Sequence, residues 1–272
     1  SASGGIAPYT YSWTGPDGFT SSNQNPVVTN VGTANAGNYD LVVTDANGCV
    51  TSTATTTVVV NENPVIDNIS SNSPVCEGET LNLSVSVSGG TGPYSYSWTG
   101  PDGFTSSAQN PVISNVTSIN AGNYDVVVTD ANGCGSTTGT TTVVVNDNPV
   151  IDNISNDGPA CVGSDLTLSV SVSGGSAPYN YSWTGPDGFS SSVQNPVVSN
   201  VTTSNAGDYD VVVTDANGCS VASASTTVVI SDPVIDNIDN DGPVCEGEDV
   251  QLTSSASGGI APYTYSWTGP DG

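Results

Sequence analysis

The side chains that could do chemistry in this sequence are of few kinds. It contains 26 Asp and Glu residues and six Cys, and it lacks Lys, Arg and His, so its formal charge is −26. Without His or Lys there is no ordinary general base for a Ser or Cys nucleophile, and without Arg there is no clamp for a phosphate. Only a carboxylate pair of the glycosidase kind or a carboxylate-bound metal remains. We therefore expect a protein that is not an enzyme.

The same charge balance restricts the partners. No side chain can neutralise a phosphate, which excludes nucleic acid and anionic membrane surfaces. No apolar stretch approaches the 18 residues that a membrane-spanning helix needs, so we expect no membrane insertion. Contacts between copies of such a chain must use hydrogen bonds, apolar patches or bound metal.

The elements that carry these residues recur with a period of about 85. The Trp residues are spaced 85, 85 and 84 apart, and the Cys residues form two series with nearly the same period. A unit of 85 residues has the size of a small domain. We expect a partial domain over residues 1–62, complete domains over 63–147 and 148–231, and the start of a fourth over 232–272.

The two ends of the sequence are related to each other. Residues 1–18 are identical to residues 255–272, which gives a superperiod of 254 residues. This suggests a window of a longer periodic polypeptide, in which 1–62 are completed by a segment equivalent to 232–254. Copies joined end to end in a filament are the partners that this predicts.

Within a repeat the apolar residues alternate. Leu81, Leu83, Val85 and Val87 are separated by polar residues, and Gly, Pro, Asn and Asp punctuate such runs. A period of two with turn residues between short runs predicts antiparallel strands that form a sandwich. The expected fold class is all-β, with tandem β-sandwich domains in an extended array.

Several motifs resemble the immunoglobulin domain. They are Glu77-Gly78-Glu79, the run from Leu81 to Val85, Trp98, and the phrase Asn120-Ala121-Gly122-Asn123-Tyr124. The resemblance implies a buried Trp on strand C and a tyrosine corner before strand F. Val85 and Val126 stand where that family has its inter-sheet Cys pair. The implied core residues are Trp98, Trp183, Val85, Val126, Tyr124 and Tyr209.

The whole repeat is also similar to the PKD-like and SprB-type repeats of large surface proteins in Bacteroidetes-type bacteria. The shared phrases are Gly-Gly-x-x-Pro-Tyr-x-Tyr-x-Trp at 89–98, Ala-Gly-Asn-Tyr-Asp-Val-Val-Val-Thr-Asp-Ala-Asn-Gly-Cys at 121–134, and Cys-x-Gly at 76–78. This resemblance implies an exported, cell-surface, adhesin-like or filamentous protein. It transfers no catalytic residue.

The implied topology also suggests a candidate calcium site. It would place the turn with Glu77 and Glu79 at the end of one domain and the turn with Asp215 at the start of the next domain. Asp147 lies in the linker between them. Hard oxygen ligands from two domains and a linker suit Ca²⁺. The alternative interpretation is a solvated acidic surface that discourages aggregation.

The same topology ranks the disulfide pairings. It places Cys76 and Cys134 at opposite ends of one domain, whereas it brings Cys76 close to Cys219 of the following domain. We favour Cys76–Cys219, with Cys161 bonded to Cys49 of the next copy as its image. The alternative is a pair within each domain, Cys76–Cys134 and Cys161–Cys219.

Together these features favour a structural protein outside the cell or on its surface. The leading hypothesis is a stiff fibre or the stalk of an adhesin. The alternative is an adhesion module whose loops bind a glycan or another cell.

Overall fold

The computed structural model describes residues 2–221 and 223–270, which form an all-β structure. The helices in this described part are 3-10 turns of three residues each. Strand pairing is antiparallel in almost every ladder, which confirms the predicted fold class. The chain divides into two compact units, residues 1–145 and 146–272, and each is described by itself.

The first unit begins with a single four-stranded sheet in the order β2-β1-β3-β4. Its strands and 3-10 turns are β1 (Thr10–Thr14), η1 (Pro16–Gly18), β2 (Thr20–Ser21), η2 (Thr33–Asn35), β3 (Gly37–Thr44) and β4 (Ala54–Val58).

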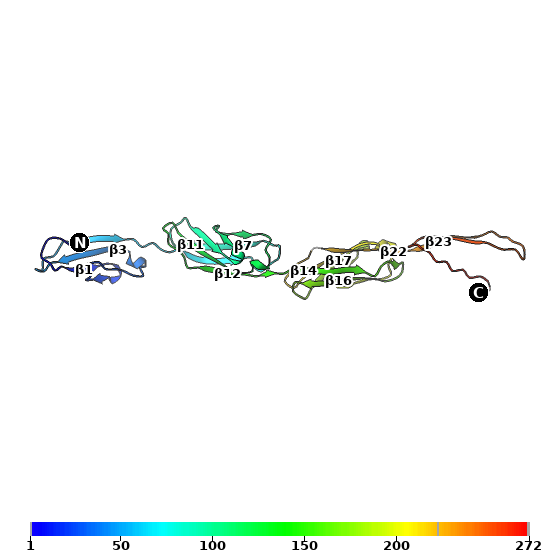
Figure 1. Cartoon of the computed structure of the whole chain (residues 1–272), viewed down its shortest axis with the longest axis horizontal. Helices are drawn as coiled ribbons and strands as arrows, with labels where there is room; N and C mark the ends of the chain where they lie inside the picture. The colour runs from blue at the N-terminus through cyan, green and yellow to red at the C-terminus, as the bar shows by residue number, and fades with distance from the viewer. Residues whose placement is uncertain (1, 222, 271–272) are drawn as a thin grey trace. The chain divides into compact units, whose positions relative to one another are not determined.

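The second repeat follows in the same unit and has two facing sheets, β10-β7-β5 and β12-β11-β8-β9 (Figure 1). Its elements are β5 (Val65–Ser71), β6 (Val75–Cys76), β7 (Leu81–Ser88), β8 (Ser95–Thr99), η3 (Pro101–Gly103), β9 (Thr105–Ser106), β10 (Val112–Ile113), η4 (Ser118–Asn120), β11 (Gly122–Thr129), β12 (Gly139–Val143) and β13 (Val145–Asn146).

The second unit repeats this pattern with sheets β14-β16-β19 and β18-β17-β20-β21, and its parallel pair, β15 with β22, corresponds to the two-stranded sheet β13-β6 of the second repeat. Its elements are β14 (Pro149–Asn156), β15 (Ala160–Cys161), β16 (Leu166–Gly174), β17 (Asn180–Thr184), η5 (Pro186–Gly188), β18 (Ser190–Ser191), β19 (Val197–Val198), η6 (Thr203–Asn205), β20 (Gly207–Thr214), β21 (Ala224–Val228) and β22 (Ile230–Ser231). A hairpin of β23 (Pro233–Asn240) and β24 (Leu252–Gly258) completes it.

The core of each complete repeat lies between its two sheets. In the second repeat, Leu81, Leu83 and Val85 of β7 are buried against Trp98 and Val126 of the opposite sheet. The equivalent residues of the third repeat form a second, matching cluster. The period of two produces this arrangement, because alternate side chains of a strand share one face.

The six residues expected in the core are all buried. Trp98 and Trp183 are each 1% exposed, and the remaining four are exposed by 4% or less, namely Val85, Val126, Tyr124 and Tyr209. The Trp98 indole N–H donates to the carbonyl of Ala108 at 3.0 Å. Because both rings are buried, neither Trp98 nor Trp183 is a platform on which a sugar can stack.

The tyrosine corner closes as the resemblance implies. The Tyr124 hydroxyl donates to the Asn120 carbonyl at 2.9 Å, and the edge of its ring meets Phe104 with the ring centres 5.4 Å apart. A Cβ on Gly100 would lie 2.5 Å from the Tyr124 ring, so this position accepts only glycine. Tyr209 makes the matching bond to Asn205 at 3.0 Å.

A pair of amide side chains completes the edge of β7. Gln109 Nε2 donates to the Val85 carbonyl at 3.1 Å, and the Val85 N–H donates to Asn110 Oδ1 at 3.2 Å. Gln194 and Asn195 hold Val170 in the same way, at 3.0 Å each. We call this pair the amide clamp. It supplies the two hydrogen bonds that a neighbouring strand would otherwise make at this position.

A buried carboxylate joins two loops at the start of each complete repeat. Asp130 is 5% exposed, and its oxygens accept the backbone N–H groups of Thr91, Asn132 and Cys134 at 2.8–2.9 Å. Burial raises the pKa of Asp130, but the hydrogen bonds from backbone N–H groups lower it by more. The resulting pKa lies below the ordinary value of 3.8. The carboxylate thus fixes the turn that carries Cys134 against the loop after β7.

The amide clamp gives a first prediction. Substituting Gln109→Ala leaves the Val85 carbonyl without its donor, which should destabilise the second repeat by about 1–2 kcal/mol. Calorimetry should show one unfolding transition at a lower temperature, with the remaining transitions unchanged. Ser107→Ala, at an exposed position of the same loop, is the control and should leave all transitions in place.

The buried carboxylate gives a second prediction. A carboxyl group with a lowered pKa stabilises the fold above its ordinary pKa, and this contribution is lost as the pH falls through the folded-state value. The melting temperature should therefore fall below about pH 4. Asp130→Asn should lower the melting temperature by several degrees at pH 7. It should also make the melting temperature less sensitive to acid pH. Asp102→Asn, in an exposed turn at φ 54° that Asn tolerates, should do neither.

Candidate functional site at the ends of the repeats

Each complete repeat has two ends that carry one Cys each. In the second repeat the C-terminal pole contains residues 75–79, which bond to Val116 and Val144 through backbone N–H groups. The N-terminal pole contains residues 89–91 and the turn 130–134. Strand β7 runs from one pole to the other, and its eight residues place them roughly 25 Å apart.

The local structure positions the two Cys residues of the second repeat differently. Cys76 is in β6 at the C-terminal pole, and its N–H donates to Glu79 Oε2 at 2.9 Å. Cys134 ends the turn at the N-terminal pole, where its N–H donates to Asp130 Oδ1 at 2.8 Å. A disulfide requires Cα atoms within about 7 Å, so this separation forbids a bond between them.

The third repeat places its Cys residues at the same two poles. Cys161 is exposed in β15, which pairs in parallel with β22 at the C-terminal pole. Cys219 is 1% exposed at the N-terminal pole. Its N–H donates to Asp215 Oδ1 at 2.8 Å, while Asp215 also accepts the N–H groups of Ser176 and Asn217 at 2.9 Å each.

The N-terminal pole of the third repeat also holds the incoming linker. A Cβ on Gly175 would lie 3.0 Å from both Asp215 Oδ2 and the backbone nitrogen of Pro149, so linker, loop and carboxylate are in close contact. Burial raises the pKa of Asp215 and the backbone N–H groups lower it, with a net lowering. The ionised carboxylate therefore fixes the backbone of Cys219 relative to Ser176, next to the glycine that packs against Pro149.

The oxidation states of the Cys residues divide them into two sets. Cys76 and Cys219 are disulfide-bonded. Free thiols are present at Cys49, Cys134, Cys161 and Cys245. Cys134 and Cys161, one member of each alternative pair within a repeat, are thus free thiols in this structure, and the choice of pairing stays a prediction. The bond from Cys161 to Cys49 of another copy stays a prediction.

Three of the four carboxylates expected to bind calcium accept hydrogen bonds from backbone N–H groups. Glu79 accepts the Cys76 N–H, Glu77 Oε1 accepts the Ser118 N–H at 3.0 Å, and Asp215 accepts three backbone N–H groups. Asp147 is exposed. Across residues 2–221 and 223–270 there is no group of three or more Asp, Glu or Cys residues that could hold a metal ion. The calcium hypothesis thus gains no support from the side chains that suggested it.

Neither the amide clamp at Val85 nor the buried carboxylate at the N-terminal pole was predicted from the sequence. A signal for both was present, because Gln-Asn recurs at 24–25, 109–110 and 194–195, and Asp recurs at 45, 130 and 215.

Within the described residues, the helices are too short to cross a membrane.

Comparison with known proteins gives two family matches. Residues 61–145 match the PKD domain, and residues 157–188 and 245–272 match the SprB repeat. Among curated proteins, the decoration protein of Escherichia phage T5 is 39% identical over 72 residues, which cover 26% of this chain and 44% of that protein. The match thus spans less than half of that relative.

Among solved structures, the chain is similar to arrays of immunoglobulin domains. The eight N-terminal domains of Down Syndrome Cell Adhesion Molecule give a TM-score of 0.55 at 23% identity, covering 91% of this chain and 36% of that one. A three-domain titin fragment gives 0.48 at 16% identity, covering 83% of this chain and 89% of the fragment. The motifs, the fold and these family matches agree: residues 61–145 are similar to the PKD domain and residues 157–188 and 245–272 to the SprB repeat, in a chain whose fold is similar to that of immunoglobulin-domain arrays.

Proposed function

We propose that this chain is a structural segment of an extracellular stalk or fibre, in which a disulfide between successive repeats restricts their motion. The observation that carries this proposal is that the disulfide-bonded residues, Cys76 and Cys219, lie at opposite poles of their respective repeats. The proposal retains the expected domain boundaries, 63–147 and 148–231.

The pairing that we propose is Cys76 with Cys219. Four of the six Cys residues are free thiols, which leaves these two as partners for each other. The linker joins the C-terminal pole of one repeat to the N-terminal pole of the next, and each of these poles carries one of the two residues. The proposed rule is that the Cys of a C-terminal pole bonds to the Cys of the following N-terminal pole.

This rule also accounts for the free thiols. Cys161 is at a C-terminal pole, so its partner belongs to the turn of a further repeat, the position that Cys49 occupies in another copy. Cys134 is at an N-terminal pole, so its partner belongs to β6 of a preceding repeat. A polypeptide that continues the period in both directions would then be linked at every junction.

The third repeat holds its own side of the proposed bond in place. Pro149 is buried at the start of β14, and Gly174 and Gly175 are packed against the linker residues before it. The carboxylate of Asp215 holds the turn with Cys219 in place through three backbone N–H groups. A disulfide to this fixed end would limit bending, which is the property that a stalk requires.

An extracellular location is part of the proposal. Disulfides form and persist in oxidising environments outside the cell and are rare in the cytosol. The charge of −26 without cations keeps neighbouring stalks apart at low salt. Both features suit a protein that extends from a surface into the surrounding medium.

Force spectroscopy tests the proposed bond directly. The 143 positions from Cys76 to Cys219 should not extend while the bond is intact, although both complete repeats can unfold. Adding a reductant should release roughly 500 Å of additional contour length, at about 3.5 Å per residue.

Two variants complete this test. Cys219→Ser should show the full contour length without reductant. Cys134→Ser removes a thiol that is already free and should behave like the unmodified chain. If the contour length of the unmodified chain did not change on reduction, the bond between repeats would be ruled out.

A further inference from the structure

In each complete repeat, one sheet ends at a strand whose outer side is exposed. β10 is the last strand of the sheet β10-β7-β5, and β19 is the last strand of the sheet β14-β16-β19. Each strand presents an exposed valine at the same position of the repeat, with Val112 59% exposed and Val197 51% exposed. We call β10 and β19 the open edges.

The hydrogen bonds of the neighbouring strand show which way the backbone of Val112 points. Val112 lies opposite Asn82 of β7. The Asn82 N–H and C=O groups bond instead to Asn72, which follows β5 on the other side of β7, at 2.8 and 3.3 Å. The two opposed residues therefore share no hydrogen bond, and the N–H and C=O groups of Val112 point outward from the sheet.

The third repeat has the same geometry. Thr167 lies opposite Val197 and bonds instead to Asp157, which follows β14, at 2.8 and 3.2 Å. Pro196 faces inward, and its carbonyl accepts the Leu168 N–H at 2.9 Å. Because the proline faces inward, its missing N–H leaves the outward groups of Val197 unaffected.

The opposite edge of the same sheet is protected against pairing, whereas the open edge is not. The register of the ladder shifts at Asp67 in β5 and at Asp152 in β14, and both carboxylates are exposed. A bulge and a charge on an edge strand each discourage pairing with another chain. The open edges, Val112–Ile113 and Val197–Val198, contain neither.

The sequence around the open edges carries little charge. Asp102 is the only carboxylate in residues 80–124, and Asp187 is the only one in residues 166–207. Because the chain has a charge of −26 and no cation, two copies repel each other least where carboxylates are few. A second copy of this chain therefore fits the open edge, since it offers the same uncharged segment and the same outward N–H and C=O groups.

We propose that an open edge of one copy pairs with the equivalent open edge of a second copy in an antiparallel ladder, which joins two three-stranded sheets into one. Val112 of one copy then lies opposite Val112 of the other, and the two residues exchange two N–H···O=C bonds. The contact is isologous, so it uses the same surface on both copies. This inference goes beyond the proposed function, because it concerns contacts between stalks and does not depend on the disulfide within one stalk.

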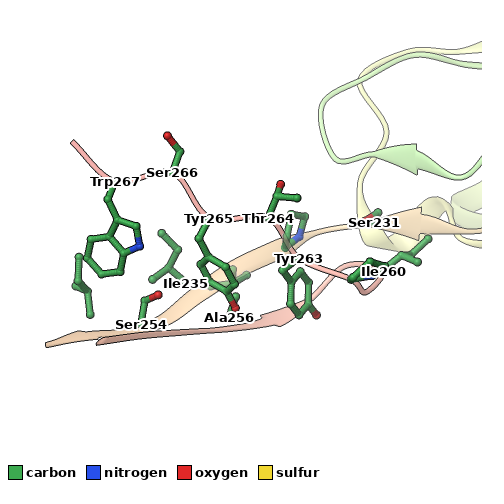
Figure 2. A pocket seen from close by; sticks show the side chains of 14 residues that line it. Ser231, Ile235, Ser254, Ala256, Ile260, Tyr263, Thr264, Tyr265, Ser266 and Trp267 are labelled. Carbon is green, nitrogen blue, oxygen red and sulfur yellow. The ribbon is translucent and has the colours of Figure 1, made fainter. Parts of the chain in front are cut away.

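The hollow over the hairpin of β23 and β24 is not a competing site. Its volume is about 440 Å³, and Figure 2 shows Tyr265 and Trp267 pointing toward the hairpin across it. Trp267 corresponds to Trp183, and Ser254 of the hairpin corresponds to Val170. These equivalents are 1% and 4% exposed in the core of the third repeat. The side chains that line this hollow thus occupy core positions of the repeat.

Charge sets the conditions for pairing. The carboxylates outside the open edges still repel each other when two copies approach, and salt screens this repulsion. Association should therefore become stronger as sodium chloride is raised from about 50 to about 500 mM. An interface that depends on ion pairs would show the opposite trend.

The test places a charge on the open edges of the full chain. Val112→Asp and Val197→Asp bring like charges face to face in the proposed ladder, which is destabilising. Val65→Asp and Val150→Asp are the matched controls, because these valines are 55% and 52% exposed in the protected strands β5 and β14. Each substitution adds the same charge. Sedimentation velocity at about 500 μM chain and about 500 mM salt measures the assembly state.

The number of open edges predicts the size of the assembly. The unmodified chain and the doubly substituted control should form dimers and larger assemblies. Val112→Asp or Val197→Asp alone should stop at dimers, because one open edge remains. The chain with both substitutions should be monomeric, with association at least about 10-fold weaker.

Hydrogen exchange gives a second readout on the unmodified chain. The amides of Val112 and Val197 should exchange more slowly as the chain concentration rises, because the ladder uses both N–H groups. The amides of Val65 and Val150 should exchange at the same rate at every concentration.

Three results would overturn the pairing inference. They are an unmodified chain that stays monomeric under these conditions, a double variant that assembles like the control, or assemblies in which the Val112 and Val197 amides exchange as fast as in the monomer. Force spectroscopy separates this failure from that of the proposed function. A monomeric chain that keeps its disulfide-protected length refutes the pairing alone, whereas an assembly of chains without that length refutes the bond between repeats alone.

Discussion

The lack of any cationic side chain is the constraint on which the rest of the structure depends. With 26 carboxylates and no Lys, Arg or His, each buried or crowded carboxylate must find N–H or O–H donors instead of an ion-pair partner. Asp130 and Asp215 take backbone N–H groups from two loops each, and Asp125 takes the hydroxyl of Thr140 at 2.5 Å. The carboxylates are thereby converted from a source of repulsion into the groups that fix the turns at the poles.

This constraint also determines how repeats can be joined. Contacts between repeats or between copies cannot use salt bridges, and like charges at a junction repel. The proposed covalent bond between poles does not depend on charge, and it would act on a turn that Asp215 and Gly175 hold in place. The lack of cations thus bears both on the local turns and on the proposed junctions between repeats.

The sequence was sufficient to predict the fold and the core, because both depend on apolar periodicity. Alternation along β7 and the recurring Trp place Leu81, Leu83, Val85 and Trp98 in one cluster, as the structure has them. The hydrogen bonds across loops were not predicted. Gln109 and Asn110 lie in a loop, and a period of two says nothing about which backbone groups of Val85 they hold. The calcium hypothesis counted Glu77, Glu79 and Asp215 without knowing that each accepts backbone N–H groups within its own repeat, and it stays a prediction.

The central claim is that a disulfide joins the C-terminal pole of one repeat to the N-terminal pole of the next. Peptide mapping by mass spectrometry without reduction tests it most directly, with an Asp-directed protease because the chain offers no Lys or Arg for trypsin. For the isolated 272-residue chain the account predicts one linked pair of peptides, containing Cys76 and Cys219. Cys134 and Cys161 should be alkylated as free thiols, because their predicted partners belong to other repeats. A linked pair containing Cys76 with Cys134, or Cys161 with Cys219, would contradict it.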